Sequence, residues 1–369
     1  MASGYRPRIV DAELRACLAA SKVLLDEWQV EPALWNQVRR AVDAVDAPGQ
    51  FLLTGSAVPA DDAERHTGAG RFSFLRLRPM SLVESGAGQG GVSLAALLEG
   101  QPPSCADPGL GVADLAELIC RGGWPAQLER PLAAASRAAR DYLEQVRQVD
   151  LQRLDGRRRD PQRLGALLRS LGRNVATEVS LATLAADAGG ADGPLDSRTV
   201  ADHLQALERL MVLENQPAWR PHLRSKAALR QAPRRHFCDP SLAVAALGGS
   251  PDRLLKDLEW LGLLFESLVI RDLRVLAQAL DGEVFHYRDD YGIEVDAIVQ
   301  LRDGRWGAIE VKLGQGQVEA AAAGLLRFRQ QIDTRRTGEP AFLAVVCGSG
   351  YGYRRADGIA VVPVGALGP

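Results

Sequence analysis

Three residues near the end of the sequence have the types and spacing needed for metal-assisted phosphate chemistry: Asp296, Glu310 and Lys312. Each is expected to lie on a strand, where alternate residues share a face, so that Glu310 and Lys312 point the same way. Two carboxylates can hold a hard divalent ion such as Mg²⁺. That ion polarises a phosphate and lowers the pKa of bound water, and a lysine can stabilise developing negative charge.

A fourth candidate, Glu266, lies on a long helix predicted at about 251–280, before these strands. On the preceding strand, Glu294 and Asp296 should share a face. Glu-Val-Lys is also common on the solvated face of an amphipathic strand, so the spacing alone leaves a catalytic and a solvated interpretation open. We name Asp296 and Glu310 as metal ligands and add Lys312 and Glu266 as catalytic candidates.

A second acidic pair, Asp26 and Glu27, ends an apolar run that is expected to be a buried strand at 23–27. An acid pair at the end of a central parallel strand is typical of P-loop ATPases, where one acid holds Mg²⁺ through water and the other orients the attacking water. Such a strand should follow a loop ending Gly-Lys-Ser/Thr. The sequence has only the lysines Lys22, Lys226, Lys256 and Lys312, and none stands in that context.

Several segments together carry a specific resemblance. The stretches LLDEWQ (24–29), FLLTGSA (51–57), GAGR (68–71) and LRPMSLVESG (77–86) occur in this order. Gly122-Gly123-Trp124-Pro125, DPSLAVAAL (239–247) and EVK (310–312) follow. This order resembles a prokaryotic AAA-type ATPase family whose members carry a C-terminal domain of unknown function that looks like a restriction-endonuclease fold. The resemblance covers nearly the whole chain.

The resemblance implies roles for the N-terminal residues. Asp26 would match the Mg²⁺-holding acid and Glu27 the catalytic acid, Thr54 and Ser56 would match the γ-phosphate sensor, and Arg71 would face a phosphate or an interface. The phosphate-binding loop of the family has no counterpart here, and its backbone N–H groups and lysine provide most of the phosphate cradle. We therefore expect ATP to be a cofactor only if that loop is supplied, and Mg²⁺ to be the candidate metal.

The middle of the chain predicts a winged-helix-like unit. Helices are expected at about 161–172, 180–188 and 196–211, followed by an extended pair. Between Gln216 and Phe237 lies a basic strip without an acid, and Trp219 adds an aromatic ring that could contact phosphates. Its candidate DNA contacts are Arg220, Arg224, Lys226, Arg230, Arg234 and Arg235. Winged helices also serve as protein–protein spacers, so a structural role is the alternative.

These elements predict a multi-domain α/β protein. We place a truncated AAA-type core at 1–85, a helical lid or linker at 86–160, the winged-helix-like domain at 161–248 and the restriction-endonuclease-like domain at 249–369. The core would contain a helix at about 32–46 and strands at 51–56 and 72–77, and 86–111 would be a loop. The last domain would contain strands at 284–287, 294–301, 306–313, 341–346 and 358–364, with a helix at about 317–332.

Composition bears on the cellular compartment and on the partners of the protein. The net charge of −2 gives no global attraction to nucleic acid or membrane, and no segment approaches the ~20 apolar residues of a membrane span. Five cysteines without metal spacing indicate reduced thiols. We expect a cytoplasmic protein with no membrane partner, with DNA, a second copy or another protein as partner.

Two classes of function remain open from the sequence. The chain would be an ATPase-family protein that does not hydrolyse ATP alone and whose nuclease-like C-terminal domain binds Mg²⁺ and DNA. Alternatively it would be a non-catalytic regulatory or scaffolding protein with two relic sites. A start codon assigned too far downstream would make it part of a full ATP-binding protein.

Overall fold

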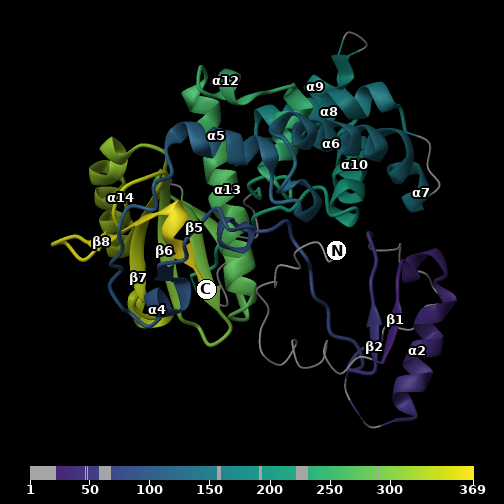
Figure 1. Ribbon diagram of the computed structural model, residues 1–369, viewed down its shortest axis with the longest axis horizontal. Coiled ribbons are helices and arrows are strands. Elements are labelled where there is room, and N and C mark those ends of the chain that lie inside the picture. The colour runs from purple at the N-terminus through teal and green to yellow at the C-terminus, as the bar shows by residue number, and fades with distance from the viewer. Residues whose placement is uncertain are drawn as a thin grey trace.

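A six-stranded mixed sheet forms the C-terminal part of the protein (Figure 1). The computed structural model describes residues 22–45, 47, 49–57, 68–155, 159–190, 193–221, 232–289 and 291–369. The strand order is β4-β5-β6-β7-β9-β8, in which β6, β7 and β9 are parallel and the other neighbours antiparallel. The strands are β4 (Gly282–Arg288), β5 (Glu294–Leu301), β6 (Trp306–Lys312), β7 (Phe342–Cys347), β8 (Tyr353–Arg354) and β9 (Ala360–Pro363).

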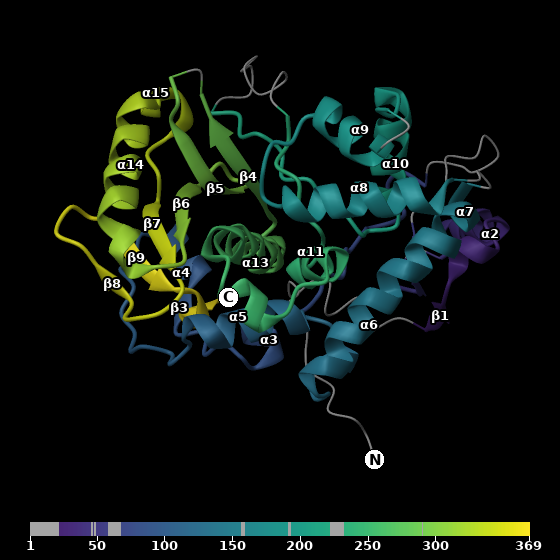
Figure 2. The ribbon, with the colours of Figure 1, turned by 90° about the horizontal axis from the view of Figure 1, so that it is seen from above.

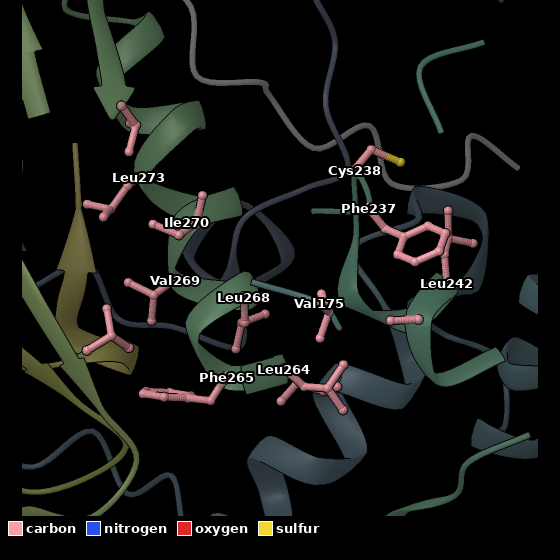
Figure 3. Packing of buried hydrophobic residues seen from close by; sticks show 14 of the residues in the cluster. Val175, Phe237, Cys238, Leu242, Leu264, Phe265, Leu268, Val269, Ile270 and Leu273 are labelled. Carbon is pink, nitrogen blue, oxygen red and sulfur yellow. The ribbon is translucent and has the colours of Figure 1, made fainter. Parts of the chain in front are cut away.

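Helices cover both faces of this sheet. Helix α13 (Leu258–Gln278) packs on one face, and α14 (Val318–Gln331) and the short α15 (Thr334–Thr337) follow β6 on the way to β7. Figure 2 shows α13 between the sheet and the helical part of the chain. Because α13 is covered from both sides, most of its residues are buried, and Phe265 and Leu268 have no exposed surface (Figure 3). An apolar helix buried all round is the expected centre of a core.

The helical part precedes α13 in the chain. Helix α11 packs against α5, α6, α8 and α13, so the helices share one apolar cluster with the C-terminal sheet. A π-helical turn at Val146–Asp150 joins α6 to α7. The helices are α5 (Val112–Arg121), α6 (Leu132–Gln145), α7 (Leu151–Asp155), α8 (Pro161–Arg173), α9 (Leu181–Gly189), α10 (Ser197–Arg209), α11 (Pro240–Leu247) and α12 (Pro251–Leu254).

Extended segments join the helical part to the sheet. After α10, Leu213 and Gln216 pair antiparallel with Phe237 and Arg234, and Thr177 pairs with Arg235. The first of these segments then continues to Ala218, which pairs parallel with His286 on β4. Three helices with extended antiparallel pairing fit the winged-helix interpretation, which stays a prediction, and the wing-like segment adds to the edge of the C-terminal sheet.

The N-terminal strands are more exposed than predicted. Strands β1 (Val23–Leu25) and β2 (Phe51–Leu53) form a parallel pair with α2 (Ala33–Asp43) between them in the chain. Leu24 is 62% exposed, so β1 is not the buried strand that its apolar run suggested. A two-stranded sheet leaves surface that a central strand would bury.

The third strand predicted at 72–77 does not form. Residues 72–78 have no regular structure. Phe72 stacks on Trp35 with ring centroids 3.9 Å apart, and Phe74 remains 83% exposed. Further on, Arg78 forms an ion pair of 2.7 Å with Glu214. The side chains of this segment therefore lie in separate environments, and the alternation of apolar and polar residues does not reflect a strand.

Two further predictions need correction. The segment 86–111, expected to be a loop, contains β3 (Val92–Ser93) and α4 (Leu94–Leu98), just after the short helix α3 (Leu82–Ser85). β3 pairs with the C-terminal strand β10 (Leu367–Gly368). The helix expected at 251–280 is interrupted before Leu258, where the Asp257 carboxylate caps α13 by accepting from the N–H of Trp260. The general α/β class is confirmed, and the P-loop and endonuclease folds remain predictions.

A buried ion triad holds three distant segments against α13. The Arg271 guanidinium lies 2.8 Å from Asp239 and 2.7 Å from Asp272, and all three residues are at most 3% exposed. Asp239 also accepts from the N–H of Gly123, and Asp272 from the N–H of Leu82, both at 2.9 Å. Three segments that carried the family resemblance, around 80–84, 122–125 and 239–247, thus meet at one cation.

Replacing the shared cation should destabilise the protein strongly. Arg271→Met leaves two buried carboxylates without their partner, which typically costs about 3–5 kcal/mol. Urea unfolding followed by circular dichroism would measure the loss of unfolding free energy. Arg302→Met is the control because Arg302 and its partner Asp281 are both more than 70% exposed, and it should change stability little. Equal losses in the two variants would contradict a structural role for the triad.

Candidate functional site

Asp296 lies where strands β5 and β6 separate. The β5–β6 ladder ends at the pair Ala297–Ile309, and the β4–β5 register shifts at the same place. Such a bulge re-aims side chains next to a break in the ladder. Beyond the break the β5 backbone no longer pairs with β6, and the Asp296 carboxylate takes its place: Oδ2 accepts from the N–H of Val311 at 2.9 Å. The break therefore fixes this carboxylate against β6.

Lys312 connects the two predicted metal-binding acids. Its Nζ lies 3.2 Å from Asp296 Oδ2 and 2.7 Å from Glu310 Oε2. On β6, Ile309 and Val311 belong to the apolar core, and Glu310 and Lys312 alternate with them as the sequence predicted. The structure thus brings together the three residues singled out from the sequence, on neighbouring strands.

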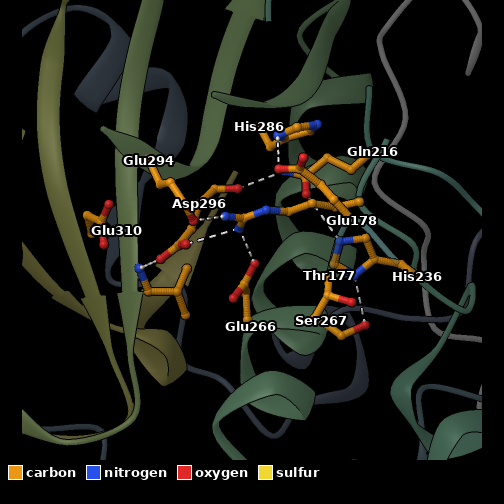
Figure 4. Close-up of polar contacts among 12 residues, drawn as sticks. Thr177, Glu178, Gln216, His236, Glu266, Ser267, His286, Glu294, Asp296 and Glu310 are labelled. Carbon is orange, nitrogen blue, oxygen red and sulfur yellow. Dashed lines mark hydrogen bonds and ion pairs between the residues drawn. The ribbon is translucent and has the colours of Figure 1, made fainter. Parts of the chain in front are cut away.

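An arginine from the helical part of the chain enters the same site. Arg234 Nη1 lies 2.6 Å from Glu266 Oε1 and 3.0 Å from Asp296 Oδ1, and Nη2 lies 3.3 Å from Glu294. Figure 4 shows Glu266, Glu294 and Asp296 around the point where these contacts converge. The Arg234 side chain is only 7% exposed, whereas that of Glu294 is 44% exposed. Solvent therefore reaches the site from the side of Glu294.

Polar groups behind Arg234 fix the segment that carries it. Gln216 Nε2 donates to the carbonyl oxygens of Asp296 at 2.8 Å and Phe285 at 3.0 Å. His236 bridges Gln216 Oε1 and Ser267 Oγ through its two ring nitrogens, each at 3.1 Å. Burial and then the nearby arginines lower the pKa of His236 well below its usual range, so the ring stays neutral. The network belongs to both parts of the chain.

The acids of the site titrate differently. Burial, followed by the charge of Asp296, raises the pKa of Glu266 to about 8 and that of Glu310 to about 8, against the attraction of the nearby cations. Burial also opposes ionisation of Asp296, but Lys312 and Arg234 together lower its pKa. Asp296 is therefore the acid that ionises first as pH rises, before Glu266 and Glu310.

Asp296 and Glu310 are the residues that could hold a divalent cation, which would have to bring its remaining ligands. One oxygen of Asp296 and one of Glu310 converge on a single cationic atom, Lys312 Nζ. Four carboxylates (Glu266, Glu294, Asp296, Glu310) face two cations, Arg234 and Lys312. Over the described residues there is no group of three or more His, Cys, Asp or Glu that could hold a metal ion by itself. Mg²⁺ suits such a site because it usually keeps waters and uses only one or two carboxylates.

The predicted N-terminal site residues also meet, except for one. Thr54 Oγ1 donates to Asp26, and Ser56 Oγ lies 3.1 Å from Glu27 Oε2, because β1 and β2 are parallel and end side by side. Both acids are exposed. Arg71 instead pairs with Asp43 at the end of α2, so its predicted phosphate or interface contact is not supported by its present partner.

Some residues of the basic strip are buried and one is exposed, which corrects part of the DNA-contact prediction. Arg234 is 6% exposed and Arg235 is 9% exposed, and Arg235 donates to Asn215. Trp219, 2% exposed, packs against Trp306 and does not face solvent. Extended pairing draws these residues inward, and only Arg220 among the described candidates is exposed. Arg224, Lys226 and Arg230 lie outside the described residues.

Sequence reasoning missed Arg234 and Gln216 as parts of the acidic site. Arg234 was grouped with the basic strip because it lies in a run without acids, and its partners are 32 to 62 positions away. The available signal was alternation, since Arg234 and His236 occupy the same face of an extended segment. Glu294, whose face was predicted, also joins the site.

Two regions match known domain families. Residues 112–253 match a domain of unknown function (DUF8612), and residues 261–367 match a second domain of unknown function (DUF4143). The second is a domain found in AAA-ATPase-associated proteins, which supports that part of the resemblance. Neither description names an ATPase, a nuclease or a ligand. No curated protein and no solved structure matches the chain.

Among the described residues, no helix combines the length with the apolar character needed to cross a bilayer.

The raised pKa of Glu266 should make stability pH-dependent. Glu266 has a pKa of about 8 in the folded protein, against 4.5 for the free group, so the folded state binds this proton more tightly than the unfolded state. The resulting stabilisation is fully present below pH 4.5 and is lost as pH rises through 8. Glu266→Gln keeps the neutral form at all pH values. The wild type should therefore lose on the order of 2–4 kcal/mol relative to Glu266→Gln between pH 5 and pH 9.

Urea unfolding of both proteins at pH 5, 7 and 9 would measure this difference. Glu283→Gln, which replaces a side chain that is 63% exposed, should follow the wild type across the range. A constant gap between wild type and Glu266→Gln would contradict the assignment.

Proposed function

We propose that this chain is an AAA-ATPase-associated protein whose C-terminal domain is restriction-endonuclease-like and hydrolyses phosphodiesters in DNA with a divalent cation. The observation that carries the proposal is the convergence of Asp296, Glu310 and Lys312 where β5 and β6 separate. A solvated strand face would not bury these acids, whose side chains are only 10% and 11% exposed.

The order of elements supports this class of fold. A helix, three antiparallel strands, a second helix and a strand parallel to the third follow one another as α13, β4, β5, β6, α14 and β7. The acids stand on the second and third strands of this unit and on its first helix. This is the order of helical Glu, strand Asp and strand Glu-x-Lys that the sequence indicated.

Each residue has a role in the proposed reaction. Asp296 and Glu310 would hold the cation, which supplies an activated water and neutralises charge on the phosphate. Lys312, held between the two acids, would face the negative charge that develops on the phosphate oxygens. Glu266 would add a carboxylate from α13. Water adds to phosphorus and one P–O bond breaks, which leaves a phosphomonoester and a hydroxyl group.

The N-terminal residues belong to a separate part of the proposal. Asp26, Glu27, Thr54 and Ser56 would form the magnesium and water side of a nucleotide site. The printed sequence contains no Gly-Lys-Ser/Thr loop, so this chain by itself would not hydrolyse ATP.

A scaffolding function is the second candidate, and Arg234 favours it. Its guanidinium already satisfies Glu266 and Asp296 by direct contact, as in a purely structural ion network. In that case the carboxylates would join two parts of the fold and would bind no metal. The two candidates differ in whether the site takes up a cation from solution.

Cleavage of plasmid DNA with Mg²⁺ or Mn²⁺ would test the nuclease proposal. Asp296→Asn and Lys312→Met should lose at least about 100-fold in rate because each removes a charge used in the transition state. Calorimetric titration with Mn²⁺ should show binding to the wild type and none to Asp296→Asn. Glu283→Gln, on the exposed part of β4, serves as the matched acid control and should cleave like the wild type.

Equal nicking by the wild type and Asp296→Asn would indicate a contaminating nuclease. If neither protein cleaves DNA and neither binds Mn²⁺, the scaffolding function is supported instead.

A further inference from the structure

The acidic site is assembled from both matched domain regions. The region 261–367 supplies Glu266, Glu294, Asp296, Glu310 and Lys312, whereas Arg234 comes from the region 112–253. Arg234 is also the group with the most carboxylate partners there, because it contacts three acids within 3.3 Å. The properties of the site therefore depend on where the helical part of the chain holds this one side chain.

Arg234 and a divalent cation held by Asp296 and Glu310 would share Asp296. Arg234 Nη1 contacts Asp296 Oδ1. Asp296 Oδ2 already accepts from the N–H of Val311 and pairs with Lys312 Nζ. A divalent ion on Asp296 would lie close to the guanidinium, and like charges at such separations repel strongly in a partly buried site. Removing the arginine would leave Glu266, Glu294 and Asp296 without this counter-charge.

We infer that Arg234 is an affinity-determining residue of the cation site, whose guanidinium competes with the cation and links its binding to the docking of the Arg234 segment. The inference rests on the proposed cation site at Asp296 and Glu310. It concerns binding alone and needs no cleavage to occur.

The link to docking follows from how the segment is held. Arg234 exchanges two backbone hydrogen bonds with Gln216, at 2.9 and 3.0 Å, and Arg235 donates its N–H to Thr177. The Gln216 segment continues to Trp219, whose N–H donates to His286 on β4 at 2.7 Å. A cation that weakens the hold of the acids on Arg234 therefore loosens a segment bonded to both regions. Because binding linkage is reciprocal, loosening this segment also favours the cation.

Manganese titration of the full chain, without nucleic acid, tests the competition. Arg234→Met should bind Mn²⁺ at least about tenfold more tightly than the wild type, because a competing positive charge is gone. Arg234→Lys keeps the positive charge, so its Mn²⁺ affinity should lie closer to that of the wild type than the affinity of Arg234→Met does. Arg235→Met is the matched control on the same segment, since Arg235 is similarly buried but pairs with Asn215, and its Mn²⁺ affinity should equal that of the wild type.

Hydrogen exchange of peptides covering 232–238 tests the linkage. Saturating Mn²⁺ should speed amide exchange there by a factor comparable to the affinity gain of Arg234→Met. Asp296→Asn should show no such change. Arg234→Lys keeps this test valid if Arg234→Met does not fold, because it should show the same acceleration.

The outcomes separate this inference from the nuclease proposal. Tighter Mn²⁺ binding by Arg234→Met together with absent DNA cleavage would support the inference and contradict only the nuclease proposal. Equal or weaker Mn²⁺ binding by Arg234→Met, with binding abolished in Asp296→Asn, would overturn the inference alone. Slower exchange at 232–238 on adding Mn²⁺ would also overturn it.

Discussion

The fold depends on one buried cation, Arg271, and on its place at the middle of α13. A charged group this deep is tolerable only because Asp239 and Asp272 surround it and both carboxylates also accept backbone N–H groups. Those backbone groups belong to turns that must approach closely: a Cβ on Gly123 would lie 2.1 Å from the carbonyl oxygen of Met80. The ion triad therefore fixes the path of the chain at Leu82, Gly123 and Asp239 against α13.

Helix α13 also contributes Glu266 to the acidic site, and the two clusters follow the same physical rule. Each places an arginine between carboxylates from sequence-distant elements. They differ in solvent access, since the three side chains of the Arg271 triad are at most 5% exposed, whereas the acidic site has an exposed side at Glu294. Charges that are enclosed on all sides serve the fold, and charges near solvent are where a ligand would act.

Much of the C-terminal domain could be predicted from sequence. The strand 294–301 has the predicted bounds, because apolar residues dominate it and turns flank it. Strand alternation placed Glu310 and Lys312 on one face, and the Asp…Glu-x-Lys pattern of the resemblance added Asp296 to them. What failed depends on partners far away in the chain: nothing local to 72–77 shows that Arg78 pairs with Glu214, and nothing local to Arg234 shows that it turns inward. Exposure of β1 likewise depends on what packs beside it.

The pairing of β3 with β10 has a consequence for how the protein is made. Val92 and Ser93 find their partners in Leu367 and Gly368, which are synthesised long after them. The α3–β3–α4 segment therefore cannot complete its contacts until those residues have been made, even if the helices between them fold as they emerge. Closing this pair joins the two ends of a very long loop, which is slow relative to local folding. A bulky insertion directly beside Leu367 or Gly368 would interfere with closing this pair.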